Sequence, residues 1–171
     1  GERMNTRLTG LIVAALVFLA DQFSKYMVMV PFDLKNRGQI ELLPFFNLTW
    51  VENYGISMGF LTADTALGQW LLVAMTGAIS AVVLVWLWRE RNRTDVLALG
   101  LILGGAIGNI VDRIRFGHVV DFADLHFGDI RPFLVFNVAD AAITIGVVIL
   151  VLRALLVREK PKVPKKENAD A

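Results

Sequence analysis

Four apolar stretches, each long enough to cross a lipid bilayer, constrain the fold of this 171-residue chain more than any other feature. They cover residues 8–30, 67–88, 96–114 and 136–157. A bilayer core about 30 Å thick needs about 20 apolar residues in a helix that rises 1.5 Å per residue. Hydrophobic residues make up 56% of the chain and the mean hydropathy is +0.58, more than a water-soluble domain of this length carries. We therefore predict an all-α membrane protein with four transmembrane helices.

The chain is predicted to form one integral membrane domain over residues 5–159. Residues 1–3 precede Met4 and have the composition of a remnant left by a cleaved expression tag. Residues 160–171 contain two prolines and mixed charges, which predicts a disordered cytoplasmic tail. The first apolar stretch follows Arg7 as in a signal peptide, but no small-residue cleavage site comes after it. We therefore expect it to be retained as a helix.

The distribution of Lys and Arg predicts the orientation, because these residues are retained on the cytoplasmic side of a membrane. Ten of the 17 lie in segments that would share one side: Arg3, Arg7, Arg89, Arg91, Arg93, Arg158, Lys160, Lys162, Lys165 and Lys166. The two opposite segments, residues 31–66 and 115–135, carry four: Lys35, Arg37, Arg115 and Arg131. Both termini are therefore predicted to be cytoplasmic, and the two opposite segments to lie outside.

The first outer segment is expected to fold. Residues 39–52 combine Ile, Leu, Phe, Thr, Trp and Val with Pro44 and Asn47, a composition typical of short strands. We predict a small extracytoplasmic β-sheet that forms a cradle on the outer surface of the membrane. A cap that only stabilises the helices is the alternative.

Charged side chains inside the apolar stretches indicate function or tight pairing, because each costs about 2.5 kcal/mol or more in lipid. Asp21 and Lys25 are four residues apart, which places them on one helix face within reach of an ion pair. Such a pair either compensates its own charge or also orients a catalytic group. Gly100, Gly104 and Gly108 recur every fourth residue, a pattern that lets two helices pack closely.

A polar stripe continues at the outer end of the third stretch with Asn109, Asp112 and Arg113. Asp112 and Arg113 either neutralise each other, or the Arg binds a substrate carbonyl or orients a carboxylate. At the start of the fourth stretch, Asn137 and Asp140 share a helix face. A helix cap explains Asn137 better than Asp140, which is expected about one turn inside the helix.

The predicted topology brings Asp121 and Asp140 to a similar depth, because the third stretch exits outward and the fourth returns from the same side. By sequence alone Asp121 belongs to an ordinary loop. Two adjacent carboxylates cannot both ionise cheaply, so one keeps a proton. Such a pair can hydrolyse a peptide bond, with the charged acid activating water and the protonated acid donating to the carbonyl oxygen. Asn109, Arg113 and Asn137 would then position the peptide.

Composition limits the alternatives. The chain has no Cys and two His, which excludes thiolate nucleophiles and Cys-type metal sites, and its near-balanced charge argues against nucleic-acid binding. A small transporter or proton pathway that uses intramembrane carboxylates is the main alternative. A metal hydrolase is another, with a site built from His118, His126, Asp121 and Asp124. A purely structural subunit does not explain acids in costly positions.

Five motifs, in order along the chain, resemble those of lipoprotein signal peptidases, the bacterial type II signal peptidases. They are Asp-Gln-x-Ser-Lys at 21–25, Val-x-Asn-x-Gly at 51–55, Gly-Gly-Ala-x-Gly-Asn-x-x-Asp-Arg at 104–113, Gly-His-Val-Val-Asp-Phe at 117–122 and Phe-Asn-x-Ala-Asp at 136–140. The resemblance covers the chain from Thr9 to Val157. One departure is Met58, where an aromatic residue is expected more often, and it affects the shape of one pocket wall.

The resemblance implies an aspartic endopeptidase of the bacterial cytoplasmic (inner) membrane, with its active site at the outer face. Such an enzyme cleaves diacylglyceryl-modified prolipoproteins just before the lipidated Cys, without a metal or other cofactor. It implies contact with membrane lipid and inhibition by the cyclic peptide globomycin, and we expect a monomer. By similarity, the site residues are the dyad Asp121 and Asp140, the lining residues Asn53, Gly55, Asn109, Arg113 and Asn137, and the supporting pair Asp21 and Lys25.

Overall fold

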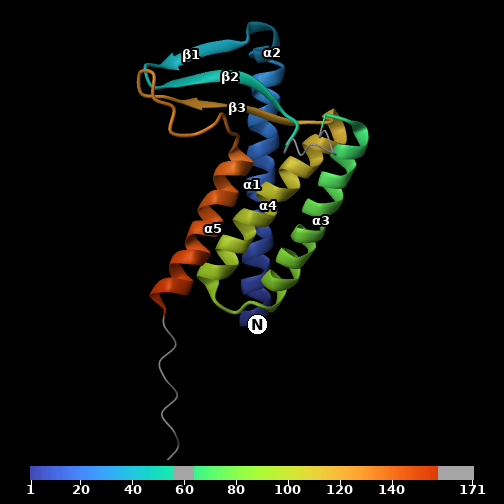
Figure 1. The fold of residues 1–171 in the computed structure, drawn as a ribbon. Helices are drawn as coiled ribbons and strands as arrows, with labels where there is room; N and C mark the ends of the chain where they lie inside the picture. The colour runs from blue at the N-terminus through green and yellow to red at the C-terminus, as the bar shows by residue number, and fades with distance from the viewer. Residues whose placement is uncertain (56–63, 158–171) are drawn as a thin grey trace, which may run out of the picture.

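Four long helices and a three-stranded sheet make up the structure, a computed structural model that describes residues 1–55 and 64–157 (Figure 1). The helices long and apolar enough to cross a membrane are α1 (Glu2–Met29), α3 (Ala66–Arg89), α4 (Arg93–Phe116) and α5 (Val138–Leu156). The short helix α2 covers Leu34–Arg37, and the strands are β1 (Gln39–Leu43), β2 (Phe46–Asn53) and β3 (Val119–Leu125). The predicted fold class is confirmed. Met58 and residues 160–171 lie outside the described residues.

Capping side chains, rather than hydropathy, set where three of the helices begin. The Thr65 hydroxyl accepts a hydrogen bond from the backbone N–H of Gly68 at the start of α3, and Asn92 does the same for Asp95 at the start of α4. Asn137 caps α5. Because a cap satisfies N–H groups that the helix itself leaves unpaired, helices α3 and α4 extend beyond the apolar stretches.

Helix α4 is the centre of the bundle, where it packs against α1, α3 and α5. The predicted glycine pattern lies at its contact with α1: a Cβ at Gly100 would lie 2.6 Å from the carbonyl oxygen of Gly10, and one at Gly104 would collide with that of Ala14. On the α5 side, a Cβ at Gly105 would lie 2.6 Å from the carbonyl oxygen of Ala139. Close backbone approach on both sides therefore depends on small residues.

The sheet is antiparallel with the order β1-β2-β3. Strands β1 and β2 confirm the sheet predicted over residues 39–52. The third strand corrects the prediction of a loop around Asp121, because residues 119–125 pair with β2 and place Val51 opposite Asp121. Val119, Val120 and Phe122 are residue types that favour strands, yet the pairing partner lies about 70 residues earlier in the chain.

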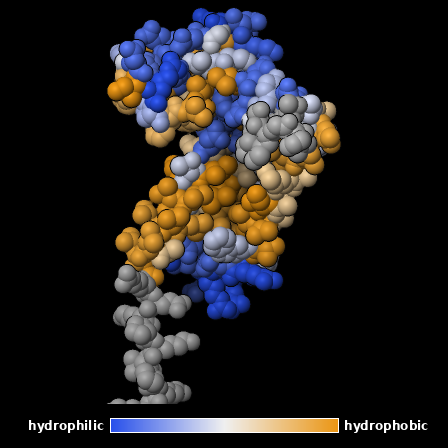
Figure 2. Space-filling model, in the orientation of Figure 1, coloured by the Kyte–Doolittle hydropathy of each residue, from blue (hydrophilic) through white to orange (hydrophobic). Residues whose placement is uncertain are grey.

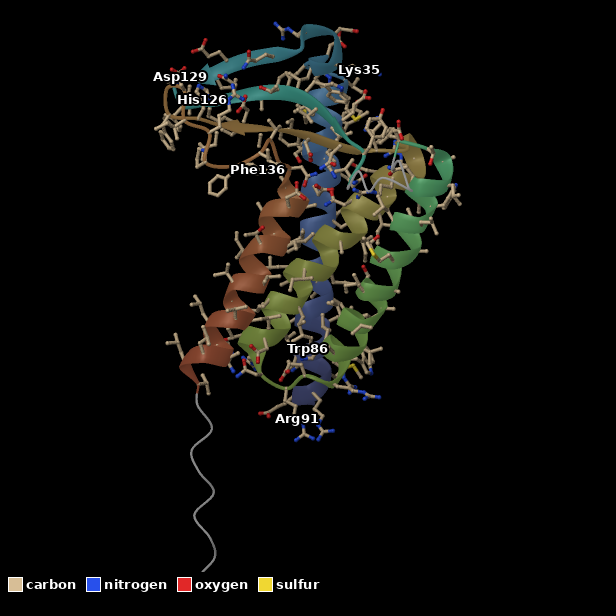
Figure 3. All side chains as sticks on the ribbon, in the orientation of Figure 1. Lys35, Trp86, Arg91, His126, Asp129 and Phe136 are labelled. Atoms are coloured by element: carbon tan, nitrogen blue, oxygen red, sulfur yellow. The ribbon has the colours of Figure 1, made fainter. Side chains whose placement is uncertain are left out.

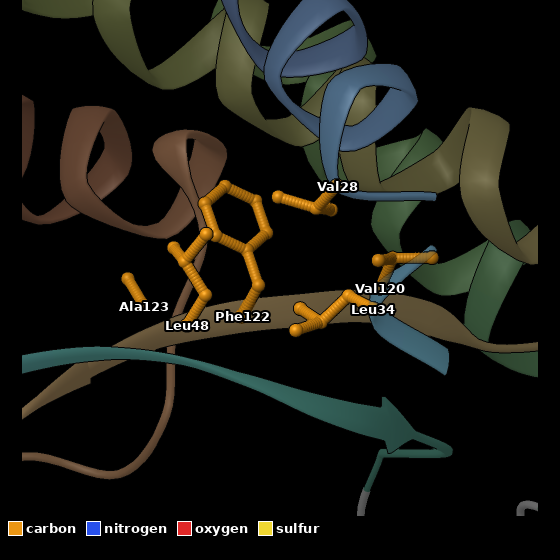
Figure 4. Close-up of a cluster of buried hydrophobic side chains, with 6 residues drawn as sticks. All are labelled: Val28, Leu34, Leu48, Val120, Phe122 and Ala123. Carbon is orange, nitrogen blue, oxygen red and sulfur yellow. The ribbon is translucent and has the colours of Figure 1, made fainter. Parts of the chain in front are cut away.

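A cluster of buried apolar side chains fixes the sheet to the end of α1. Figure 4 shows Val28 of α1 and Leu34 of α2 facing four sheet residues, Leu48, Val120, Phe122 and Ala123. Leu34 and Val120 are fully buried. The sheet is therefore held above the bundle as one unit with α1.

The surface separates into an apolar belt and two polar ends. In Figure 2 hydrophobic residues cover the middle of the bundle, while hydrophilic residues gather on the sheet and at the opposite end. Exposed Leu16 of α1, Val82 of α3 and Leu155 of α5 belong to this belt. The start of α1 and the end of α5 both lie at the end away from the sheet (Figure 1). This arrangement fits a multi-pass membrane protein.

Candidate active site

The segment before α5 is fastened to β3, and this brings two acids from distant parts of the sequence together. Phe136 exchanges backbone hydrogen bonds with Ala123 at 2.8 and 3.0 Å and lies between the sheet and α5 (Figure 3). Asp121 precedes this bridge on β3, and Asp140 follows it in the first turn of α5. Asp121 is 2% exposed, whereas Asp140 is half-buried.

Asn137 connects the two carboxylates. Its side-chain Nδ2 donates to Oδ1 of Asp121 at 2.8 Å, and its backbone N–H donates to Oδ2 of Asp140 at 3.2 Å. In return, the backbone N–H of Asp140 donates to Oδ1 of Asn137 at 2.8 Å. The reciprocal bonds form a capping box. Asp140, three residues after Asn137, lies about one turn inside the helix and is also part of the helix cap.

Two further amides complete the bonds to the acids. Asn53, at the end of β2, donates through Nδ2 to Oδ2 of Asp121 at 3.0 Å. Asn109 of α4 donates through Nδ2 to Oδ1 of Asp140 at 3.2 Å. Each of the four carboxylate oxygens therefore accepts a hydrogen bond from an uncharged amide. Among the described residues, no cation is bonded directly to either acid.

A second pair of aspartates lies behind the first, around a buried lysine. The ammonium of Lys25 lies 2.7 Å from Oδ2 of Asp21 and 2.8 Å from Oδ2 of Asp112. It also donates to Oδ1 of Asn109 at 3.3 Å, which joins this cluster to the amides around Asp140. The backbone N–H of Ala139 donates to Oδ1 of Asp21 at 3.0 Å. Lys25 thus connects α1 and α4, and Asp21 holds the start of α5.

The predicted ion pair between Asp21 and Lys25 is confirmed. Of the two alternatives for Asp112 and Arg113, mutual neutralisation is not observed, because Asp112 pairs with Lys25. Asp112 is fully buried and binds Lys25, and its Oδ2 also accepts from the backbone N–H of Val120 at 3.0 Å. Sequence reasoning missed this residue as a site support. Its spacing of three residues from Asn109 placed it on the right helix face, but the partner in α1 was not visible from spacing.

Arg113 and Gly55 lie beside each other at the open edge of the network. Gly55 has a φ of +89°, and a Cβ there would lie 2.7 Å from Leu72 and 3.4 Å from Nη2 of Arg113. Glycine is therefore needed both for the backbone conformation and for the space. Nε of Arg113 is buried and has no hydrogen-bond partner among residues 1–55 and 64–157. A buried donor of this kind is available to a ligand.

The electrostatic environment favours a shared proton at this site. Burial raises the pKa of Asp121 to about 7, and the nearby charge of Asp140 acts in the same direction. Hydrogen bonds from Asn53 and Asn137 and the charge of Lys25 oppose these effects without cancelling them. Near neutral pH one proton is therefore held by an acid that would be ionised in water.

An apolar pocket of about 290 Å³ opens next to Asp140. It is lined by Phe133, Phe136, Asp140, Ala141, Thr144 and Ile145. The pocket lies below the sheet on the lipid-facing side of α5, where Figure 2 shows a hollow. One of the two acids is thus accessible from a surface that suits an apolar ligand.

The residues considered for a metal hydrolase do not converge. Asp124 is bound by Arg131 at 2.8 Å and by the hydroxyl of Thr49 at 2.8 Å, whereas the nearest carboxylate to His118 is that of Glu52, at 3.9 Å. Within the described part of the chain, no three His, Asp or Glu side chains form a group that could hold a metal ion. The geometry therefore does not favour that alternative.

Comparison with known proteins identifies the family. The family model for signal peptidase (SPase) II matches residues 13–156. The chain belongs to the signal peptidase II family. The lipoprotein signal peptidase of Rhizorhabdus wittichii is 64% identical over 165 residues, which is 96% of this chain and 95% of the relative. That of Sphingopyxis alaskensis is 62% identical over 151 residues, covering 88% of this chain and 87% of the relative.

A solved bacterial membrane enzyme has the same fold as this signal peptidase II. It aligns with a TM-score of 0.72 at 28% identity, covering 92% of this chain and 94% of the other. The predicted class of enzyme, a membrane peptidase that removes signal peptides from prolipoproteins, is confirmed by the family match and these relatives. The transporter alternative is not favoured.

Proposed function

We propose that Asp121 and Asp140 are the catalytic dyad of this peptidase and that it cleaves diacylglyceryl-modified prolipoproteins just before the lipidated Cys. The observation that carries the proposal is the bridge through Asn137, which binds both carboxylates while neither receives a hydrogen bond from a described cation. Amide donors fix the acids in position and leave them free to exchange a proton. This is the requirement for acid–base hydrolysis without a nucleophilic side chain.

The proposed reaction starts with the proton on Asp121 and the charge on Asp140, in agreement with the raised pKa of the buried acid. The apparent pKa belongs to the pair, because the two acids are coupled. Asp140 takes a proton from water as the water oxygen bonds to the scissile carbonyl carbon, and Asp121 donates its proton to the carbonyl oxygen. The resulting diol collapses when Asp140 protonates the leaving nitrogen and Asp121 recovers a proton from a diol hydroxyl.

Supporting roles follow from the contacts of each residue. Asn53, Asn109 and Asn137 hold the acids, and Asp21 with Lys25 fixes the helices that carry them. Arg113, next to Gly55, has a buried donor without a hydrogen-bond partner in the described part of the chain, and this donor suits a substrate carbonyl. No metal or other cofactor takes part in the proposed reaction.

The proposed substrate matches the surface around Asp140. An apolar pocket beside the acid suits the acyl chains and the signal helix of a lipidated precursor, which reach the site from the bilayer. We place the site at the outer face of the bacterial inner membrane, with both termini in the cytoplasm, because basic residues concentrate at the end away from the sheet. Inhibition by globomycin and action as a monomer are part of the same proposal.

The test is to change each acid separately, as Asp121→Asn and Asp140→Asn, and to assay cleavage of a lipidated prolipoprotein in detergent. Each change should lower kcat by about 10²- to 10⁴-fold, because the remaining acid cannot act as both donor and acceptor. Asp124→Asn is the matched control on the same strand, and it should retain activity close to that of the unchanged enzyme. A folded Asp121→Asn or Asp140→Asn variant with substantial activity would overturn the dyad.

A further inference from the structure

Two adjoining hollows lie at the end of the bundle opposite the sheet, far from the proposed dyad. The first is an apolar groove of about 550 Å³ between α1 and α3, lined by Leu11, Leu84, Val85, Trp88 and Arg89. Leu84 is 41% exposed and Val85 is 50% exposed, so the groove is open to the surroundings of the bundle. In a membrane those surroundings are acyl chains.

The second hollow has about 240 Å³ and a basic lining. It is formed by Arg3, Arg7, Trp88, Arg89, Glu90 and Arg91. Trp88 and Arg89 line both hollows, so the apolar groove leads directly into the basic pocket. Figure 3 places Trp86 and Arg91 at this end of the bundle, and Figure 2 shows the hydrophilic surface there below the apolar belt.

The positive charge of the pocket is only partly compensated, because Glu90 is the one acid among lining residues that include four arginines. Glu90 is engaged by its own helix end, since its carboxylate accepts from Nε1 of Trp86 at 3.1 Å and from the backbone N–H of Arg91 at 2.9 Å. In the part of the chain that the structure describes, Arg89 and Arg91 form no ion pair with a carboxylate. Among those residues, two guanidinium groups of the protein's own sequence are therefore available to an anion.

Arg7 gives the pocket a fixed wall. Its Nε donates to the carbonyl oxygen of Trp88 at 2.8 Å, and its guanidinium carbon lies 4.6 Å from the centre of the Trp88 ring. The bond satisfies one of the last carbonyl groups of α3, which a helix leaves unpaired. Both the hydrogen bond and the cation–π contact hold Arg7 between α1 and α3.

We propose that the two hollows together bind one anionic glycerophospholipid, with its phosphate among the arginines and an acyl chain in the groove between α1 and α3. Arginine matches phosphate geometry, and basic pockets between transmembrane helices suit anionic headgroups. Trp88 lines both the groove and the pocket. Tryptophan is enriched at the membrane–water interface, so this position fits the boundary between acyl chains and headgroups. A second copy of the chain is a poorer occupant. A symmetric contact at this face would bring the arginines of one copy against those of the other, and their positive charges would repel.

Native mass spectrometry of the full chain tests the proposal. After reconstitution in mixed phosphatidylcholine and phosphatidylglycerol and mild extraction, one phosphatidylglycerol should remain bound per chain, with phosphatidylcholine removed. The double variant Arg89→Gln/Arg91→Gln should lower retention about tenfold or more, because each basic residue contributes to binding an anionic lipid. The control Lys35→Gln/Arg37→Gln removes the same charge at the sheet end and should retain the lipid.

Two tryptophan substitutions that leave the charge unchanged distinguish lipid binding in the groove from general charge effects. Leu84→Trp fills the groove and should reduce retention, whereas Val82→Trp adds the same bulk at a lipid-exposed position of α3 and should not. Thermal unfolding checks that each variant is folded. Equal retention of the two lipids, retention unchanged in the Leu84→Trp variant, displacement by inorganic phosphate alone, or a chain dimer in place of the lipid-bound chain would each overturn the proposal.

Discussion

Two pairs of aspartates share one buried network, and their hydrogen-bond donors differ in charge. Asp21 and Asp112 both bind the ammonium of Lys25, at 2.7 and 2.8 Å. Asp121 and Asp140 accept from the amides of Asn53, Asn109 and Asn137 instead. A cation bonded to a carboxylate stabilises its charged form strongly, whereas neutral amide donors stabilise it less and, at Asp121, do not overcome the effect of burial.

The difference in donors suggests different roles for the two pairs: one pair stabilises the fold, and the other takes part in the proposed reaction. The pair around Lys25 fastens α1 to α4 and, through the backbone of Ala139, to α5. The pair held by amides lies where β3 meets α5, and Asp140 borders an apolar pocket. Removal of the cation should therefore damage the fold, and removal of either amide-held acid should damage turnover with less effect on the fold.

The largest expected effect on stability comes from Lys25→Met. The change leaves two buried carboxylates without their cation, which should lower the free energy of unfolding by about 3–5 kcal/mol. Lys35→Met is the matched control, because the Lys35 side chain is 67% exposed and its pair with Glu52 should contribute about 1 kcal/mol or less. Chemical unfolding in detergent measures both.

A double variant sharpens this prediction. Adding Asp112→Asn to Lys25→Met removes one of the uncompensated charges and should recover part of the lost stability. If Lys25→Met proved no more damaging than Lys35→Met, the distinction between the two acid pairs would fail.

An intermediate effect is expected from Gly108→Ala. A Cβ at this position would collide with Oδ2 of Asp21, so the methyl group should displace the carboxylate from Lys25 and cost about 1–3 kcal/mol of unfolding free energy. Gly77→Ala on α3 is the control, because a Cβ there meets no atom within 4 Å. It should leave stability equal or slightly higher, since alanine favours a helix. Equal effects of the two changes would contradict the close contact.

These variants also mark what the sequence could and could not predict. The four helices follow from length and hydropathy, and Asp21 with Lys25 follows from helical spacing. Asn109, Asn137 and the two proposed catalytic acids followed from helical spacing and the predicted topology, whereas Asn53 came from motif resemblance. Strand β3 was missed because its partner β2 is distant in sequence, and the bond between Asp112 and Lys25 was missed because it joins two helices. Spacing defines a helix face, but not the neighbour that covers it.

The capping role of Asp140 was missed for a related reason. Its position three residues after Asn137 fits a capping box, and the backbone bonds between Phe136 and Ala123 hold the chain just before this cap. Those bonds depend on β3, a strand that the sequence did not predict. The register of the sheet therefore determines the depth of both acids.

A further expected effect is a pH dependence of stability. The pKa of Asp121 is raised in the folded protein to about 7 from the ordinary value of 3.8. Folding then favours its protonated form, so this acid stabilises the protein at low pH and the contribution is lost as the pH rises through about 7. Thermal unfolding from about pH 4 to about pH 8 should show this decline, and Asp121→Asn should remove it. If the dependence of thermal stability on pH were the same in Asp121→Asn, the titrating group would be a residue other than Asp121.

Infrared spectroscopy of protonated carboxyl groups tests most directly whether Asp121 and Asp140 share a proton. We expect one carboxyl band in the folded peptidase that disappears as the pH rises through about 7, in line with the raised pKa of Asp121. The band should be absent from Asp121→Asn, should titrate at lower pH in Asp140→Asn, and should persist in Asp112→Asn. A band that survives in Asp121→Asn but disappears in Asp112→Asn would assign the proton to the wrong pair and contradict the account.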